Sequence, residues 1–397
     1  MNETVAAPAE RFNYAAYLLE LNAGRAAKTA YIDDTGALTY GELDGAVRRL
    51  AAALCAAGIR REERVLLLMH DNNDWPVAFL GAMYAGIVPV AVNTLLSADD
   101  YRYMLRHSRA QAVLVSNALL PVLREAMAAG EHEVGTVVVS CAEGDLPDGE
   151  VSFEAFVGSA TAAAQPADTH RDDPGFWLYS SGSTGQPKGV AHVHASLRAT
   201  ADTYGAHILQ LSQEDTVFSA AKLFFAYGLG NALTFPLAVG ATAVLFPGRP
   251  TPQDMLDTLN AEKPTVFYGV PTLFAAMNAE MDKSGRPDAP LRRAVSAGEA
   301  LPEDVGKRWQ DHTGVPILDG VGSTEMLHIF LSNAPDDVVY GTSGTPVPGY
   351  EMRLVDDNGE EVETGEIGEL VVSGASSAAC YWNQRRKSQA TFEGAWT

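Results

Sequence analysis

Short apolar runs alternate with segments of helical periodicity along most of the chain. The apolar runs predict strands at residues 65–69, 88–92, 112–116, 176–180, 216–220, 242–246 and 265–268. Helical spacing is found between them at residues 43–57, 75–86, 99–107, 252–261 and 271–283. This alternation is typical of doubly wound, mostly parallel sheets, so we predict an α/β fold.

Three segments depart from that alternation. Residues 31–43 predict a hairpin followed by a helix with Thr39 as its N-cap. Residues 158–173 are polar and aperiodic, which indicates a surface connection. From about Tyr350, short strands separated by Asn-Gly and Thr-Gly turns predict an antiparallel, barrel-like piece. We therefore predict two α/β subdomains at residues 1–171 and 172–345, and a smaller β-rich subdomain at residues 346–397.

Residues 75–96 carry no charged side chain and are long enough to cross a bilayer. Their prolines and glycines favour a buried helix that ends near Gly86, followed by a buried strand. The N-terminal sequence has early acidic residues and no apolar segment of the kind that a secretory signal needs. We expect a cytoplasmic protein that does not bind membranes.

The charge balance argues against nucleic acid as a partner. The chain has 50 acidic and 28 basic side chains, and its net charge of -22 opposes contact with a phosphate backbone. A small anion remains compatible, because backbone amides, a local cation and Mg²⁺ can form a small positive site. The 3 cysteines form no cluster of metal-ligand spacing, which fits inert thiols in a reducing compartment.

The strongest chemical signal is YSSGSTGQPKGV, at residues 179–190, which follows an apolar strand and precedes a segment of helical character. Its glycines permit positive φ and close approach of a ligand, and its hydroxyls stand beside free backbone amides. Lys188 adds a mobile cation for phosphate oxygens. The order differs from a Walker A loop, so a P-loop NTPase is not expected. A flexible loop without a ligand is the alternative, and this combined order of residues argues against it.

This segment resembles the phosphate-loop signature of the adenylate-forming superfamily, which includes acyl-CoA synthetases, luciferases and peptide-synthetase adenylation domains. The resemblance implies ATP as a ligand and makes Thr184 and Lys188 candidate catalytic residues. The nucleotide contacts that it implies in this loop are Ser181, Gly182, Ser183, Thr184, Gly185 and Lys188.

DGVGSTEM, at residues 319–326, resembles the second signature of that superfamily. The resemblance implies a catalytic pair, in which Thr324 hydrogen-bonds the α-phosphate and Glu325 holds Mg²⁺, a cation that prefers carboxylate and phosphate oxygens. A lone Thr-Glu pair would indicate only a helix N-cap with an acid near the helix dipole, and the match in order and spacing with the first loop argues against that alternative. The further nucleotide contacts that the resemblance implies here are Asp319, Gly320, Gly322 and Ser323.

SAGEALP, at residues 296–302, resembles the adenine-side loop of the superfamily. By that resemblance Gly298, Glu299 and Ala300 pass along the base, and small residues let the backbone pack against a flat ring. Taken alone, the segment fits equally well an ordinary strand-to-helix connection with Pro302 at the helix start.

AKLFFAYGLGNALTFPL, at residues 221–237, resembles the segment that forms one wall of the acyl pocket, and the likeness is nearest to benzoate-CoA ligases. An aromatic wall with a small floor suits a flat aryl acid better than a long acyl chain. The alternative for such an aromatic run is an ordinary core. The substrate contacts that the resemblance implies are Phe225, Ala226, Tyr227, Gly228, Gly320, His328 and Ile329.

His192 and His194 would share one face of a strand, which invites a metal interpretation. No third ligand of zinc spacing stands nearby, so packing and hydrogen bonding around the phosphate loop is the favoured interpretation.

The resemblance implies that an aryl carboxylate attacks the α-phosphorus of ATP, pyrophosphate leaves, and coenzyme A then takes the acyl group. Superfamily members continue past a segment like TFEGAWT into a ribose-binding Asp and a small domain with a catalytic lysine. We therefore expect a large domain only, which binds ATP and aryl acid, adenylates poorly and forms no thioester. Two alternatives are a domain that loads a carrier protein and a non-catalytic acyl-adenylate-binding module. The oligomeric state stays open, a homodimer included.

Overall fold

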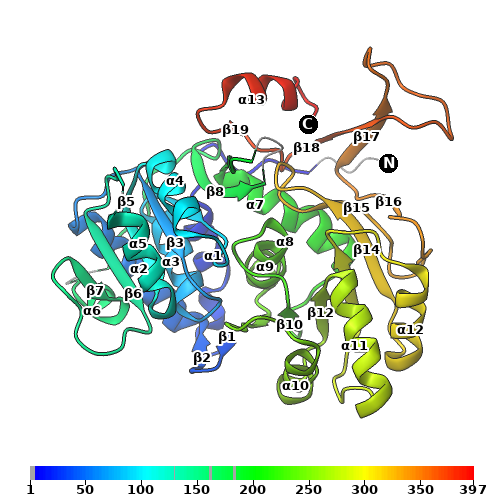
Figure 1. Cartoon of the computed structure of the whole chain (residues 1–397), viewed down its shortest axis with the longest axis horizontal. Helices are drawn as coiled ribbons and strands as arrows, with labels where there is room; N and C mark the ends of the chain where they lie inside the picture. Colours follow the sequence, from blue (N-terminus) through cyan, green and yellow to red (C-terminus); the bar gives the residue numbers. More distant parts are fainter. Residues whose placement is uncertain (1–4, 129, 161–162, 182–184) are drawn as a thin grey trace.

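The chain folds around two mixed sheets that lie side by side with helices packed on them (Figure 1). The computed structural model describes residues 5–128, 130–160, 163–181 and 185–397. In Figure 1 most of the first sheet lies on the left and most of the second sheet on the right, with β1 and β2 at the lower left of centre and α13 (Arg385–Thr391) and the C-terminus at the top.

The first sheet ends in an antiparallel edge that carries the predicted phosphate loop. Its strands are β3 (Arg64–Leu68), β4 (Val88–Ala91), β5 (Ala110–Ser116), β6 (Thr136–Ser140), β7 (Glu150–Ser152), β8 (Pro174–Ser180), β9 (Lys188–Val193) and β19 (Cys380–Tyr381). Their order is β19-β9-β8-β4-β3-β5-β6-β7, parallel except for the pairs β8–β9 and β9–β19. The helical character predicted after residue 190 is present in α7 (His194–Thr200), but was wrong for residues 191–193, which pairing with β8 and β19 makes part of β9.

The second sheet is parallel through its middle and antiparallel at both edges. Its strands are β1 (Thr29–Asp33), β2 (Gly36–Thr39), β10 (Thr216–Ser219), β11 (Thr242–Val244), β12 (Val266–Gly269), β13 (Arg293–Ala297), β14 (Ile317–Gly322), β15 (Ile329–Ser332) and β16 (Thr345–Pro346). Their order is β16-β15-β14-β13-β12-β10-β11-β1-β2. The carboxyl ends of β13 and β14, where two of the predicted motifs begin, are therefore neighbours.

Helices connect the strands, which confirms the predicted α/β class. The α-helices in addition to α13 are α1 (Tyr14–Leu21), α2 (Tyr40–Ala56), α3 (Asp74–Tyr84), α4 (Ala98–Ser108), α5 (Leu120–Ala128), α6 (Phe153–Gly158), α7 (His194–Thr200), α8 (Ala226–Leu229), α9 (Phe235–Val239), α10 (Pro252–Glu262), α11 (Pro271–Ser284) and α12 (Glu303–Thr313). The 3₁₀ and π segments are η1 (Ala23–Arg25), η2 (Asn117–Leu119), η3 (Ala201–Leu209) and η4 (Gly230–Thr234). The predicted cap of α2 is present, since Thr39 Oγ1 accepts from Glu42 N and Glu42 Oε2 accepts from Thr39 N.

Strands cross between the two halves of the chain. Tyr31 in β1 pairs with Ala243 in β11, so the first strands join the second sheet, while β8 and β9 complete the first sheet. The subdomain boundaries remain a prediction about how the chain divides. The tail forms an antiparallel ribbon of β17 (Tyr350–Val355) and β18 (Glu369–Gly374), drawn at the upper right of Figure 1.

The long apolar stretch at residues 75–96 supplies α3 and β4, as the sequence predicted. Trp75 and Phe79 stack in the core, where both are fully buried, and every residue of β4 is buried. Within the described ranges, no helix combines the length and the apolar character that a bilayer crossing needs.

The close approach of α2 to α3 gives a stability prediction. A Cβ on Gly81 would lie 2.7 Å from Leu50 Cδ2, so we expect Gly81→Ala to lower the free energy of unfolding by about 1–3 kcal/mol through overpacking. Urea unfolding measures the change. Gly24→Ala is the matched control, because nothing lies within 4 Å of its added Cβ. Equal stability of the two variants would contradict the expected clash.

Candidate functional site

The predicted phosphate loop is closed by the pairing of its two stems. Ser180 at the end of β8 pairs with Lys188 at the start of β9, so residues 181–187 span the gap between these strands. Ser181 and Gly185 lie within this span, and Gly185 has a φ of 85° that favours glycine. Gly182, Ser183 and Thr184 lie outside the described residues.

Helix α4 holds both stems of the loop. Tyr103 Oη donates to the carbonyl of Pro187 at 3.1 Å, and His107 Nδ1 lies 2.8 Å from Tyr179 Oη. Burial lowers the pKa of His107, so Nδ1 of the neutral ring accepts a hydrogen bond from the Tyr179 hydroxyl. The Tyr103 and His107 rings stack at 5.1 Å, which fixes the two contacts relative to each other.

Lys188 and Glu325 meet although they are far apart in the sequence. Lys188 Nζ lies 3.5 Å from Glu325 Oε1, and both groups contact the hydroxyl of Tyr381. Partial burial lowers the pKa of Lys188, but the hydrogen bond to Tyr381 and the charge of Glu325 outweigh it, so the net pKa is raised. Lys188 is therefore a firmly charged cation beside a carboxylate that is only 16% exposed.

The Thr324–Glu325 pair lies in a tight turn between β14 and β15 rather than at a helix start. Ser323 Oγ accepts from Met326 N at 3.0 Å, and Leu327 has a φ of 69°. His192 Nε2 lies 2.8 Å from the carbonyl of Thr324. The turn is thus held from its own residues and from β9.

His192 supports the packing interpretation of the two histidines. Its ring stacks on Phe176 at 5.1 Å, and burial lowers its pKa to about 4, so the neutral ring donates to the Thr324 carbonyl. His194 begins α7 instead of continuing β9, and its Nδ1 accepts from Tyr14 N. Among the residues that the structure describes, no group of three His, Cys, Asp or Glu side chains could hold a metal ion.

The two remaining nucleotide motifs lie on adjacent strands. Ser296 and Ala297 of β13 pair with Asp319 and Gly320 of β14, and Gly298 follows with a φ of 97°. Glu299 and Ala300 come next on the exposed surface. Burial raises the pKa of Asp319 to about 6. This strand edge therefore combines a glycine of positive φ with one buried carboxyl group.

A cavity of about 750 Å³ joins the predicted nucleotide and substrate residues. The predicted residues that line it are Gly298, Gly322, Ser323, Thr324, Phe225, Ala226, Tyr227, His328 and Ile329. Gly228 and Gly320 are buried beside it instead, where added Cβ atoms would meet Lys222 O at 2.0 Å and Ile329 Cγ2 at 2.8 Å. Both glycines allow close packing of the backbone behind the cavity wall.

Tyr227 and His328 form a fixed aromatic corner in this cavity. Tyr227 Oη donates to the carbonyl of Val295 at 3.1 Å, and its ring centroid lies 5.5 Å from that of His328. His328 Nε2 lies 3.2 Å from both Tyr227 O and Asn231 Oδ1. Burial lowers the pKa of His328 to about 3, so this corner is uncharged at neutral pH.

The sequence analysis missed two residues of the region, Lys222 and Tyr381. Lys222 lines the cavity, and burial lowers its pKa while the buried Asp71 opposes that effect. Lys222 lies in AKLFFAYGLGNALTFPL, where a single charged residue within an apolar run could have indicated a role in the site. Tyr381 gave no such signal, because only the pairing of β19 with β9 brings it to Lys188.

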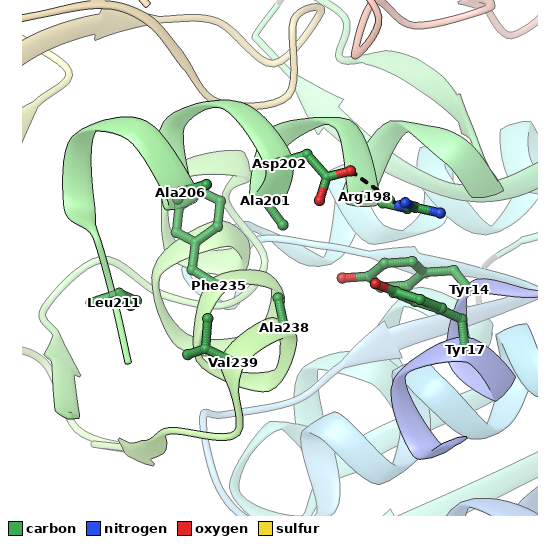
Figure 2. A pocket seen from close by; sticks show the side chains of 11 residues that line it. Tyr14, Tyr17, Arg198, Ala201, Asp202, Ala206, Leu211, Phe235, Ala238 and Val239 are labelled. Carbon is green, nitrogen blue, oxygen red and sulfur yellow. Dashed lines mark hydrogen bonds and ion pairs between the residues drawn. The ribbon is translucent and has the colours of Figure 1, made fainter. Parts of the chain in front are cut away.

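A second cavity, of about 130 Å³, lies between α1, η3 and α9 (Figure 2). Figure 2 shows Tyr14 and Tyr17 on one side and Ala238 and Val239 on the other, below the ion pair of Arg198 and Asp202. The cavity contains none of the predicted site residues. Phe235, which lines it, packs edge-on against His328 at 4.6 Å and so stands between the two cavities.

Comparisons with known proteins identify a family and similar structures for this chain. The AMP-binding enzyme family matches residues 19–382. A benzoate–CoA ligase from Thauera aromatica is 52% identical over 392 residues, which are 98% of this chain and 73% of that protein. The structure of a benzoate CoA ligase from Burkholderia xenovorans superposes with a TM-score of 0.91 at 52% identity, covering 97% of this chain and 76% of that one. The structure of an anthranilate CoA ligase in complex with anthranoyl-AMP superposes with a TM-score of 0.94 at 39% identity. The match covers 98% of this chain and 75% of that one.

The buried state of His192 predicts a pH dependence of stability. Its pKa of about 4 lies below the ordinary value of about 6.5, so in that pH window the unfolded chain binds a proton that the folded chain does not. The free energy of unfolding therefore decreases as pH falls, and this histidine contributes up to about 3 kcal/mol of that decrease. We expect His192→Gln, which can still donate to Thr324 O, to lose less stability than the wild type between pH 6.5 and pH 4.

Urea unfolding of both proteins across this window measures the difference. The comparison also removes the contributions of Asp71 and Asp319, whose pKa values are raised to about 6 and act in the opposite direction in both proteins. Identical pH slopes in the two proteins would show that the folded protein protonates His192 without the expected cost.

Proposed function

The chain belongs to the AMP-binding enzyme family, and from this premise we propose that it activates a benzoate-type aryl carboxylic acid with ATP and passes the aroyl group to coenzyme A. The observation that carries this proposal is the single cavity in which Gly298 and Thr324 of the nucleotide motifs open onto the aromatic corner of Tyr227 and His328. An acid and a nucleotide bound there would be adjacent, as adenylate formation requires.

The first step needs positioning and charge stabilisation instead of a protein nucleophile. A carboxylate oxygen of the acid attacks the α-phosphorus of ATP, the bond to the β-phosphate oxygen breaks, and pyrophosphate leaves with its electron pair. Lys188, held as a cation by Tyr381 and Glu325, can follow the phosphate charge as it shifts to the leaving group. Thr324, on a turn held by His192, can donate its hydroxyl to the α-phosphate.

Glu325 can supply the one carboxylate ligand that a phosphate-bound Mg²⁺ commonly uses. Oε1 of Glu325 has partners, whereas no described residue donates to Oε2. Mg²⁺ in nucleotide sites typically takes one or two carboxylates and the substrate phosphates, so a cluster of several acidic residues is not required. When bound there, Mg²⁺ would neutralise part of the triphosphate charge.

The cavity wall favours an aromatic acid. Tyr227 is pinned through its hydroxyl to the β13 backbone, and His328 is neutral, so the corner presents flat, uncharged faces. Two of the similar proteins named above are benzoate CoA ligases, and the structure of the third, an anthranilate CoA ligase, holds an aroyl-adenylate. In the second step the thiol of coenzyme A attacks the carbonyl carbon of the aroyl-adenylate, and AMP leaves. That this chain by itself adenylates poorly and forms no thioester stays a prediction.

Binding of two nonhydrolysable acyl-adenylate mimics tests this proposal without requiring turnover. We expect calorimetry to give tighter binding of a benzoyl mimic than of a medium-chain mimic. Tyr227→Ala should remove most of that preference and weaken the benzoyl mimic by about tenfold or more, since it deletes one aromatic wall.

Tyr17→Ala is the matched control, because Tyr17 lines the small separate cavity and should leave both affinities unchanged. Equal or reversed preference in the wild type would overturn the aryl substrate. If Tyr17→Ala also lost the preference for the benzoyl mimic, the effect of Tyr227→Ala would be attributed to general destabilisation of the fold.

A further inference from the structure

Tyr381 contacts both charged side chains that the proposed function assigns to ATP. Its hydroxyl oxygen lies 3.1 Å from Lys188 Nζ and 2.8 Å from Glu325 Oε1. Lys188 Nζ also lies 4.3 Å from the centroid of the tyrosine ring. The hydroxyl therefore accepts a hydrogen bond from the ammonium group and donates one to the carboxylate.

The backbone around Tyr381 fixes the place of this hydroxyl. Strand β19 pairs with β9, with Tyr381 opposite Val190. Tyr381 N donates to Ser388 Oγ at 3.0 Å, and the ring packs against Phe392 at 5.1 Å. A side chain held from its backbone and its ring in this way loses little further freedom when it orients a neighbour.

The same segment also holds the backbone of the turn that carries Glu325. Ala378 N donates to Glu325 O at 2.8 Å, and Ser376 Oγ donates to Met326 O at 2.7 Å. Glu325 is thus fixed through its main chain by residue 378 and through Oε1 by Tyr381. The side-chain partners of this carboxylate among the described residues all contact Oε1, and none of them donates to Oε2.

We propose that Tyr381 is a positioning residue for the metal–nucleotide complex. By occupying Oε1 of Glu325, its hydroxyl presents Oε2 to the divalent cation that the ATP phosphates carry. By accepting a hydrogen bond from Lys188, it keeps the ammonium group directed to the ATP phosphates instead of fully paired with the carboxylate. This inference rests on the proposed function, because it requires ATP at this site.

Calorimetric titration with ATP, once in excess Mg²⁺ and once in EDTA, tests the proposal on the chain as it exists. The ratio of the two affinities gives the gain that Mg²⁺ provides. Tyr381→Phe keeps the ring and its packing but removes the hydroxyl, so we expect this gain to fall by about tenfold, with affinity in EDTA little changed. An unchanged gain, or equal losses in both media, would overturn the proposal.

Two further variants separate positioning from general structure. Tyr350→Phe is the matched control, because it removes a buried tyrosine hydroxyl that pairs with Ser376 Oγ. Among the described residues this hydroxyl has no contact with Glu325. The gain in ATP affinity that Mg²⁺ provides should therefore persist in this variant. In a Glu325→Gln background, Tyr381→Phe should cause no further loss, since its effect passes through Glu325. An additional loss there, or a lost gain in Tyr350→Phe, would refute the positioning role.

The same titrations distinguish the two levels of inference. A wild-type chain that binds ATP in neither medium would refute the proposed function and this inference with it. A wild-type chain that shows the Mg²⁺ gain, which Tyr381→Phe retains, would leave the proposed function standing and refute only the role of Tyr381.

Discussion

The antiparallel pairing of β8 with β9 is the constraint on which the site depends. It closes the loop between Ser180 and Lys188, and it fixes which side chains of β9 face the turn after β14. Lys188 and His192 are four positions apart on this strand and therefore share one face, from which they reach Glu325 and Thr324 O. A register slip of one residue would turn both away from the turn.

The Lys188–Glu325 pair, which follows the cavity-lining Thr324, is charged, whereas the aromatic corner of the cavity is neutral. Lys188 keeps its charge because Tyr381 and Glu325 compensate for its burial, whereas burial leaves His328 and His192 uncharged. This polarity suits a substrate that is apolar in its ring and anionic at its carboxylate. It also reconciles a chain of net charge -22 with an anionic ligand, since the local positive charge is concentrated at a few positions.

Features carried by contiguous residues could be predicted from the sequence. The α/β class and the cap at Thr39 follow from local spacing, and the candidate motifs were found through a resemblance in their order. What depended on distant pairing could not be predicted. The segment after the loop becomes β9 through its two strand neighbours, and β1 joins the second sheet through β11. Tyr381 enters the site for the same reason, because its position is defined by β9 and not by its own surroundings in sequence.

The pairing of Tyr31 with Ala243 bears on the order in which a growing polypeptide can acquire structure. During synthesis from the N-terminus, β1 and β2 emerge long before the strand that receives them, and the edge of β9 waits still longer for β19. Contacts of such high sequence separation slow folding and leave strand edges transiently open to other chains. The edge of β1 therefore stays open until Ala243 has been synthesised, and the edge of β9 stays open until Tyr381 has been synthesised.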